Sequence, residues 1–253
     1  MKAYAGKKVC VACSGGADSV ALLHAFHAQA DEWGISLSAV TCEHGIRGAS
    51  SLSDLAFVRQ LCKEWGIPLF EFSANVPQLA EKNGRGLEEE GRAFRYRCFE
   101  ELVARGDADV IATAHHRDDL AETVLFRLAR GTSLAGVDAI KERAGIVRPL
   151  LSVSKAEILN YVHENGLPFV TDETNGDEKY SRNAIRIKVL PALEEVVKGA
   201  GEHIADFARR AGEDDQYLQT LALAEIKREN GEICVPVTLP RPLFFRAVVA
   251  AIR

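Results

Sequence analysis

Val9-Cys-Val-Ala-Cys-Ser-Gly-Gly-Ala-Asp-Ser19 is the stretch of this 253-residue chain from which a fold can first be inferred. A short apolar run leads into a tight turn with two adjacent glycines, and a helical pattern of apolar residues follows it. A strand that opens into a helix in this way leaves backbone N–H groups unpaired beside the positive end of the helix dipole. The turn therefore predicts a phosphate or pyrophosphate site, formed by Ser14, Gly15, Gly16, Ala17, Asp18 and Ser19.

The turn differs from the phosphate-binding loop of kinases and GTPases because it has no lysine for the terminal phosphate. Asp18 stands in the turn instead. A carboxylate beside a polyphosphate makes chemical sense mainly when Mg²⁺ lies between them. The alternative is an ordinary strand-to-helix turn, in which Ser14 or Asp18 caps the helix. This stretch alone leaves both interpretations open.

The overall composition is typical of a globular protein with one large domain, or with a main domain and a small one. Hydrophobic residues make up 47% and charged residues 26% of the chain, and the formal net charge of −5 disfavours nonspecific nucleic-acid binding by the whole surface. No apolar stretch approaches the length of a membrane span, and the N-terminus has no apolar signal core. We therefore expect a cytoplasmic protein with no membrane partner.

The six cysteines are scattered, and Cys10 and Cys13 form a C-x-x-C pattern. Inside an extended strand these two residues would lie about 10 Å apart, with side chains on opposite faces. A disulfide requires Cα atoms within about 7 Å. We therefore expect both cysteines to be small buried apolar residues rather than a redox or metal site.

Apolar runs alternate with helical patterns along most of the chain. The expected strands are 8–13, 35–42, 68–72 and 109–114, with a strand-like run at 147–151, and the expected helices are 17–33, 53–65, 87–105, 117–129 and 154–164. This alternation predicts an α/β fold, a doubly wound parallel sheet of five strands with helices on both faces. Ligands of such sheets bind beyond the carboxyl ends of the strands, so functional residues should follow strands.

Histidine and acidic residues follow the fourth expected strand. His115, Asp119 and Glu122 are spaced by four and three residues, so they would share one helix face. A capped, solvated helix start is the plain explanation, since acidic residues suit the first turn of a helix. A zinc site is a weaker alternative because no further Cys or His pair accompanies these residues. We favour Asp119, together with Asp18, as a ligand of Mg²⁺ on a nucleotide between the first and fourth strands.

Arginines of the expected helix 87–105 follow three glutamates. Surface ion pairs are the plain explanation for them, and we expect such pairs for Arg92 and Arg97. A second basic stretch, 179–188, has lysine or arginine at four positions and no acidic residue. Arg182 and Arg186 would share a helix face there. A solvated face is possible, but an anionic partner, either ATP phosphates or an RNA backbone, accounts better for this stripe.

These residues together resemble the N-type ATP pyrophosphatases, whose S-G-G-x-D-S loop corresponds to residues 14–19. Within that superfamily the chain closely resembles the tRNA(Ile)-lysidine synthetases. The shared motifs run in order through residues 8–195: H-G-I-R-x-x-S, A-H-H-x-D-D-x-x-E-T, R-G-x-x-x-x-G, R-P-L-L, D-x-T-N-x-D and R-N-x-I-R. One departure is Ser133, where the family usually has an inner glycine in the R-G-x-x-x-x-G loop.

The resemblance implies an adenine nucleotide alpha-hydrolase-like, Rossmann-like fold and a two-step reaction. ATP would adenylate O2 of the wobble cytidine in a tRNA(Ile) with a CAU anticodon, and pyrophosphate would leave. The ε-amine of free L-lysine would then attack C2, release AMP and leave lysidine. A homodimer is also possible by analogy with short members of the family.

The resemblance also assigns roles to individual residues. The loop 14–19 would hold pyrophosphate and Mg²⁺, Asp119 would supply the second essential carboxylate, and His115 would lie beside it. Arg95 and Arg182 correspond to family arginines near the reacting groups. Their fixed positive charge would offset the charge that develops on the α-phosphate and on the leaving pyrophosphate.

We expect residues 1–195 to form the catalytic domain. Residues 196–253 would form a helical linker and the start of a C-terminal domain, with helices at 201–230 and 242–253 and a strand at 232–237. The last helix has no C-cap signal, so the chain is expected to stop in or at the edge of a helix, as a truncated chain would.

Two other functions remain as alternatives. A tRNA sulfur transferase of the thiolase type could use the same nucleotide domain, but it needs catalytic cysteines or an iron–sulfur cluster, and Cys42, Cys62 and Cys98 are isolated in the sequence. A non-enzymatic nucleotide sensor would bind ATP without turnover. The nucleoside product formed with lysine would distinguish the enzymes.

Overall fold

The computed structural model describes residues 2–46, 49–137, 145–171, 181–229 and 232–252. The chain divides into two compact units. The first comprises Met1–Asp119 and Glu142–Asp177, and the second comprises Leu120–Lys141 and Glu178–Arg253. The boundary passes through helix α6 (Arg117–Ala129), which begins in the first unit and continues in the second.

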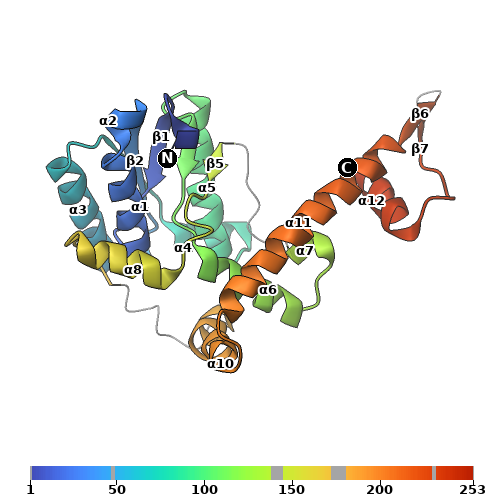
Figure 1. The fold of residues 1–253 in the computed structure, drawn as a ribbon. Coiled ribbons are helices and arrows are strands. Elements are labelled where there is room, and N and C mark those ends of the chain that lie inside the picture. The colour runs from blue at the N-terminus through green and yellow to red at the C-terminus, as the bar shows by residue number, and fades with distance from the viewer. Residues whose placement is uncertain (1, 47–48, 138–144, 172–180, 230–231, 253) are drawn as a thin grey trace. The chain divides into compact units, whose positions relative to one another are not determined.

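A sheet of five parallel strands forms the centre of the first unit (Figure 1). The strands are β1 (Lys8–Ala12), β2 (Ser36–Glu43), β3 (Leu69–Ser73), β4 (Val110–Ala112) and β5 (Ile146–Val147). Their order is β3-β2-β1-β4-β5, and each neighbouring pair is parallel. The chain first extends the sheet to one side of β1 and then to the other, so the switch point lies between β1 and β4. The predicted fold class is confirmed.

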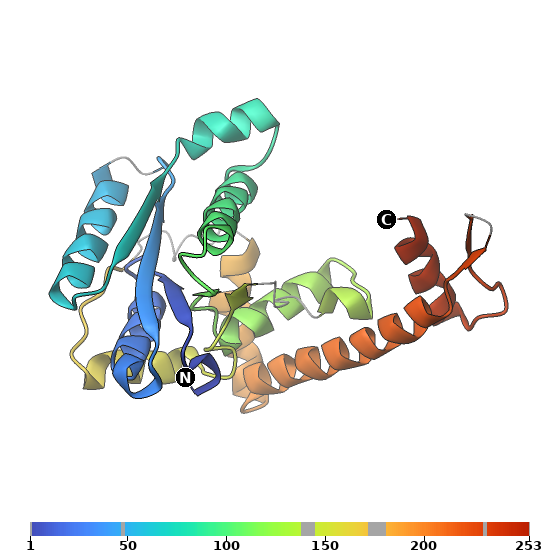
Figure 2. The ribbon, with the colours of Figure 1, turned by 90° about the horizontal axis from the view of Figure 1, so that it is seen from above.

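Helices cover both faces of this sheet (Figure 2). The helices of the first unit are η1 (Lys2–Tyr4), α1 (Ala17–His27), α2 (Ala30–Trp33), α3 (Ala49–Glu64), α4 (Val76–Asn83), α5 (Leu87–Ala104), the start of α6, and α8 (Lys155–Glu164). On one face Val9 and Val11 pack in a core with residues of α1, α3 and α8, and on the other Cys10 packs with residues of α5. The alternation of side chains along β1 therefore places apolar groups on both faces.

Cys10 and Cys13 are both buried and carry free thiols, as predicted. Burial raises the pKa of the Cys10 thiol to about 12, so this thiol stays protonated at neutral pH. Within the described part of the chain, none of the helices combines the length and the apolar character that crossing a membrane requires.

Several predicted boundaries need correction. The expected helix 17–33 is two helices, because α1 ends at His27 and α2 begins at Ala30. Helix α4 was not predicted; Asn75 caps it by accepting a hydrogen bond from the backbone N–H of Gln78 at 3.1 Å. The expected strand 147–151 is shorter, since β5 ends at Val147.

The second unit is mainly helical. Its elements are the rest of α6, α7 (Leu134–Val137), α9 (Ser181–Ala184), the π-helical turn η3 (Ile185–Val189), α10 (Leu190–Val196), α11 (Ala200–Ala224), β6 (Lys227–Glu229), β7 (Glu232–Cys234) and α12 (Arg241–Ile252). Helix α11 ends earlier than the expected 201–230, and β6 pairs with β7 as an antiparallel hairpin. An ion pair of 2.6 Å between Arg246 Nη2 and buried Asp215 Oδ1 joins α12 to α11.

Candidate functional site

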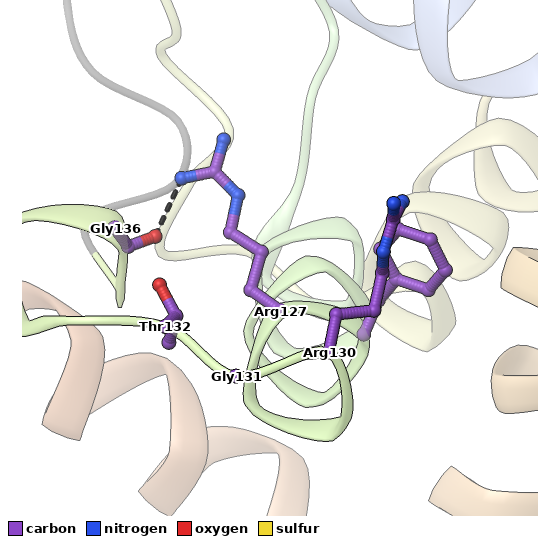
Figure 3. Close-up of a pocket in the computed structure, with 6 residues that line it drawn as sticks. Arg127, Arg130, Gly131, Thr132 and Gly136 are labelled. Atoms are coloured by element: carbon purple, nitrogen blue, oxygen red, sulfur yellow. Dashed lines mark hydrogen bonds between the residues drawn. The ribbon is translucent and has the colours of Figure 1, made fainter.

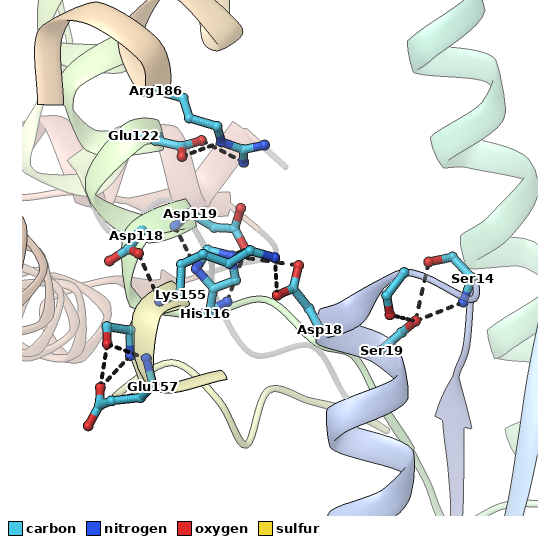
Figure 4. A network of polar contacts seen from close by, with 12 residues as sticks. Ser14, Asp18, Ser19, His116, Asp118, Asp119, Glu122, Lys155, Glu157 and Arg186 are labelled. Atoms are coloured by element: carbon cyan, nitrogen blue, oxygen red, sulfur yellow. Dashed lines mark hydrogen bonds and ion pairs between the residues drawn. The ribbon is translucent and has the colours of Figure 1, made fainter. Parts of the chain in front are cut away.

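The turn after β1 forms a closed loop at the N-terminus of α1. The backbone N–H of Ser14 donates to Ser19 Oγ at 3.2 Å, and Ser19 Oγ donates to the carbonyl oxygen of Gly16 at 2.9 Å (Figure 4). Gly15 has φ of +87°, and a Cβ there would lie 3.1 Å from Phe57 Cδ1, so this position favours glycine. Gly16 is the N-cap of α1 and makes no side-chain cap. The first N–H groups of the helix therefore suit an anion.

Two carboxylates from different elements meet at the buried side chain of His116. The Nε2 atom of His116 lies 3.9 Å from Asp18 Oδ2, on α1, and 3.4 Å from Asp119 Oδ2, on α6 (Figure 4). The backbone N–H of His116 also donates to Asp119 Oδ2 at 3.0 Å. Asp18 Oδ1 accepts a hydrogen bond of 2.5 Å from Lys155 Nζ at the start of α8. Asp18 and Asp119, the two predicted metal ligands, thus lie beside one imidazole.

His115 lies between the end of β4 and the start of α6. Helix α6 begins at Arg117, so the prediction that His115 shares a helix face with Asp119 and Glu122 is wrong. The Nδ1 atom of His115 lies 3.0 Å from Thr113 Oγ1. The ring is therefore held by Thr113, which directly follows β4, whereas the neighbouring His116 contacts the two carboxylates.

Burial lowers the pKa of His115 to about 4; nearby Asp119 opposes this shift, while Arg148, Arg92 and Arg95 add to it. We expect a neutral His115 ring at physiological pH. In the unfolded chain a histidine titrates at about pH 6.5. Between this pH and about pH 4 the unfolded state therefore binds more protons at His115 than the folded state does. As the pH falls through this interval, protonation of His115 in the unfolded state lowers the free energy of unfolding. Above about pH 6.5 His115 is neutral in both states and makes no contribution.

An NMR titration of the His115 ring, assigned with His115→Asn, should give a midpoint near pH 4. A midpoint at about pH 6.5 would contradict the burial of this ring and the effect of the nearby arginines.

The arginines of α5 differ in their partners. Arg97 Nη2 lies 3.2 Å from Glu90 Oε1, which confirms the predicted ion pair. For Arg92 the prediction is wrong: its Nη2 donates to the hydroxyl of Tyr96 at 3.1 Å, and its guanidinium lies 4.8 Å from the centre of the Tyr96 ring. Arg95 is exposed on the same helix, close enough to affect His115 electrostatically.

The basic stretch 179–188 belongs to the second unit. Residues 179–180 and the side chain of Arg182 lie outside the described residues, although the backbone of Arg182 forms part of α9. Arg186 donates from Nε to Glu122 Oε1 at 2.6 Å and from Nη2 to Glu122 Oε2 at 3.0 Å. For Arg186 the prediction of an anionic partner from outside is wrong, because Arg186 binds a buried carboxylate of the protein itself. For Arg182 the prediction lies outside the described side chains.

The R-G-x-x-x-x-G segment lines a hollow in the second unit (Figure 3). The hollow measures about 430 Å³ and is lined by Phe126, Arg127, Arg130, Gly131, Thr132 and Gly136. The guanidinium of Arg127 donates to the carbonyl oxygen of Gly136, and that of Arg130 lies 5.2 Å from the centre of the Phe126 ring. Ser133, the departure from the family pattern, supplies the carbonyl that accepts from Gly136 N at 2.9 Å.

Four residues near the predicted site were missed in the sequence: Tyr96, His116, Arg148 and Lys155. His116 and Arg148 lie within motifs that follow β4 and β5, so their place after a strand was a usable signal. Lys155 also follows β5, directly after the helix cap Ser154. Tyr96 has only its spacing of four residues from Arg92.

The fold and the glycine turn define a class of nucleotide-binding α/β domains with a pyrophosphate loop. Residues 1–193 match the family described as the PP-loop domain, and the chain belongs to this family. It is similar to curated proteins named tRNA(Ile)-lysidine synthase. The relative from Bacteroides thetaiotaomicron is 44% identical over 190 residues, covering 75% of this chain and 44% of the relative.

Two further relatives with the same name cover more of the chain. The one from Caldanaerobacter subterraneus is 39% identical over 229 residues, or 90% of this chain and 48% of the relative. The one from Bacillus subtilis is 37% identical over 228 residues, or 88% of this chain and 48% of the relative. The chain therefore spans about half the length of the curated relatives it matches.

Among solved structures, the chain is similar in fold to the U34-tRNA thiolase NcsA from Methanococcus maripaludis with its 4Fe-4S cluster. The TM-score is 0.70 at 19% identity, over 83% of this chain and 73% of that chain. This likeness concerns the fold alone.

Proposed function

We propose that the protein is an ATP-dependent tRNA(Ile)-lysidine synthetase, a carbon–nitrogen ligase that forms AMP and pyrophosphate. The observation that carries the proposal is the meeting of Asp18 and Asp119 at His116, beside the loop after β1. The names of the curated relatives support the same activity and disfavour the thiolase alternative.

The residues of the site fit ATP and Mg²⁺. Carboxylate oxygens are preferred Mg²⁺ ligands, and Mg²⁺ in nucleotide sites is usually held by one or two carboxylates together with phosphates and water. Asp18 and Asp119 would hold the ion, and the loop 14–19 would bind the pyrophosphate through its backbone N–H groups. When bound, Mg²⁺ would neutralise charge on the phosphates. Lys155, which donates to Asp18, adds a positive charge at the same place.

The proposed reaction proceeds in two steps. The O2 atom of the wobble cytidine attacks the α-phosphorus of ATP, and the bond to the bridging oxygen breaks to release pyrophosphate. The deprotonated ε-amine of free L-lysine then attacks C2, and the C2–O2 bond breaks so that AMP leaves with the cytidine oxygen. Arg95 and Arg182 would stabilise the negative charge that develops in these steps, with His115 as a neutral neighbour of Asp119.

The domain boundaries and the oligomeric state belong to the same proposal. Residues 1–195 would be the catalytic domain, and residues 196–253 a helical linker and the start of a C-terminal domain. The match of the PP-loop family over residues 1–193 supports this boundary. A homodimer stays a prediction, which light scattering of the purified protein tests.

The function is tested by the mass of the wobble nucleoside. After incubation with ATP, L-lysine and a tRNA(Ile) transcript with a CAU anticodon, we expect the mass of lysidine. Without lysine, we expect tRNA-dependent pyrophosphate exchange but no accumulation of AMP. A transcript with a UAU anticodon is the control because it lacks the reacting cytidine. A sulfur-containing nucleoside would instead establish thiolation, and an unchanged nucleoside with no AMP would overturn the proposal.

A further inference from the structure

Two arginines of the first unit meet at the hydroxyl of Tyr96. This oxygen lies 3.1 Å from Nη2 of Arg92 and 3.4 Å from Nη2 of Arg148. Arg92 comes from the same helix as Tyr96, whereas Arg148 directly follows β5. Arg148 is 6% exposed and Tyr96 is equally buried, so the guanidinium of Arg148 is held in place by packing. We name Arg92, Tyr96 and Arg148 the arginine cluster.

Other arginines near or on α5 have carboxylate partners. Arg85 and Arg97 pair with Glu90, and Arg105 pairs with Glu101 at 3.1 Å. In contrast, over the ranges that the structure describes, neither Arg92 nor Arg95 forms an ion pair with an Asp or Glu, even though α5 begins with three glutamates. The positive charges of Arg92 and Arg95, which have no carboxylate partner within those ranges, favour an anion from outside the protein.

The position in the sheet separates this cluster from the pyrophosphate loop. The loop follows β1, whereas Arg148 follows β5, and β4 lies between these two strands. Neighbouring strands are about 4.8 Å apart, so the two positions differ by about two strand spacings. An anion at the cluster is therefore distinct from a pyrophosphate at the loop. His115 follows β4 and therefore lies between the loop and the cluster in the order of the sheet. The nearby arginines interact electrostatically with its ring.

We propose that the arginine cluster binds a phosphodiester of the RNA substrate next to the nucleotide that is modified. This inference rests on the proposed function, in which the substrate is a polynucleotide. A nucleotide within an RNA chain always carries backbone phosphates beside its base, and these contacts fix register without reading sequence. Guanidinium groups suit them because they donate two parallel hydrogen bonds to phosphate oxygens. Tyr96 orients Arg92 through its hydroxyl and its ring.

The test compares Arg92→Met with Arg105→Met. Both variants remove one positive charge, but Arg105 lies at the C-cap of α5, at the opposite end of the helix from Arg92, and pairs with Glu101. The affinity of the purified protein for an anticodon stem-loop RNA with CAU is measured by fluorescence anisotropy over a series of salt concentrations. We expect Arg92→Met to weaken RNA binding about tenfold and to reduce the salt slope by about 1. Arg105→Met should leave both at wild-type values.

Tyr96→Phe keeps the ring and removes the oxygen that orients the arginines. It should weaken RNA binding about threefold, consistent with the loss of hydrogen bonds of modest net strength. Arg92→Lys keeps the charge but loses the planar fork, so it should keep the salt slope and lose part of the affinity. If Arg92→Met melts at a lower temperature than the wild type, the RNA affinity of Arg92→Lys is used to test the proposal instead.

ATP affinity, measured without RNA, distinguishes the source of the phosphate. Wild-type ATP affinity in Arg92→Met together with weaker RNA binding supports the proposal. Weaker ATP binding with unchanged RNA binding would overturn it and assign the cluster to the nucleotide, and unchanged binding of both ligands would also overturn it. Failure of the proposed function has a separate signature: the wild type would bind RNA through Arg92 yet make no lysidine.

Discussion

Asp119→Asn is expected to lower the rate of AMP release about 10³-fold at saturating ATP, tRNA and lysine, while the protein stays folded. Asp119 Oδ2 accepts the backbone N–H of His116 at 3.0 Å. An asparagine oxygen can still accept this hydrogen bond, so the substitution removes the negative charge without removing the local contact. The measurement is AMP release by chromatography, together with the thermal melting curve of each protein.

The neighbouring Asp118 provides a matched control. Its Oδ2 accepts the backbone N–H of Lys155 at 2.9 Å, so Asp118→Asn makes the same chemical change at the adjacent position of the same helix. We expect its activity to stay within about twofold of the wild type. Asp18→Asn should resemble Asp119→Asn, since both carboxylates lie beside His116. Wild-type turnover in Asp119→Asn would show that the Mg²⁺ assignment is wrong.

The sheet could be predicted because its signals are local. Val9, Cys10 and Val11 of β1 are apolar and buried, and a glycine turn and a helical pattern follow at once. Helix α4 was missed because it spans only Val76–Asn83 and lies mostly at the surface, although Asn75 before it and Gly84 after it are typical helix ends. The prediction of the fifth strand is too long. The strand ends at Val147 because Pro149, which has no N–H for a sheet, follows Arg148 directly.

The site could be predicted only in part, for a related reason. The loop after β1 is consecutive in sequence, whereas Asp18 and Lys155 are 137 residues apart and meet only in the folded chain. The choice between His115 and His116 depends on how the chain leaves β4, which spacing does not reveal. Arg92 has acidic residues within four positions before it and Tyr96 four positions after it, and both spacings suit a helical contact.

The largest expected effect on stability lies in the second unit, at the pair formed by Arg186 and Glu122. The side chain of Glu122 is 2% exposed and that of Arg186 is 39% exposed. Arg186→Met removes the two hydrogen bonds that Arg186 donates to the buried carboxylate. Breaking a buried pair from one side costs about 3–5 kcal/mol, and because Arg186 is partly solvated we expect a loss of about 3 kcal/mol in the free energy of unfolding. Urea denaturation followed by circular dichroism measures it.

Lys198→Met is the control for charge loss, since Lys198 is exposed in the same unit, and it should change stability by less than about 0.5 kcal/mol. The double variant Glu122→Gln/Arg186→Met tests the cause. It removes the buried negative charge together with its partner, so it should recover about 2 kcal/mol relative to Arg186→Met alone. If Arg186→Met unfolds at the wild-type urea concentration, the pair does not stabilise the second unit. Arg186 would then be available to an anionic partner, as the basic stretch first indicated.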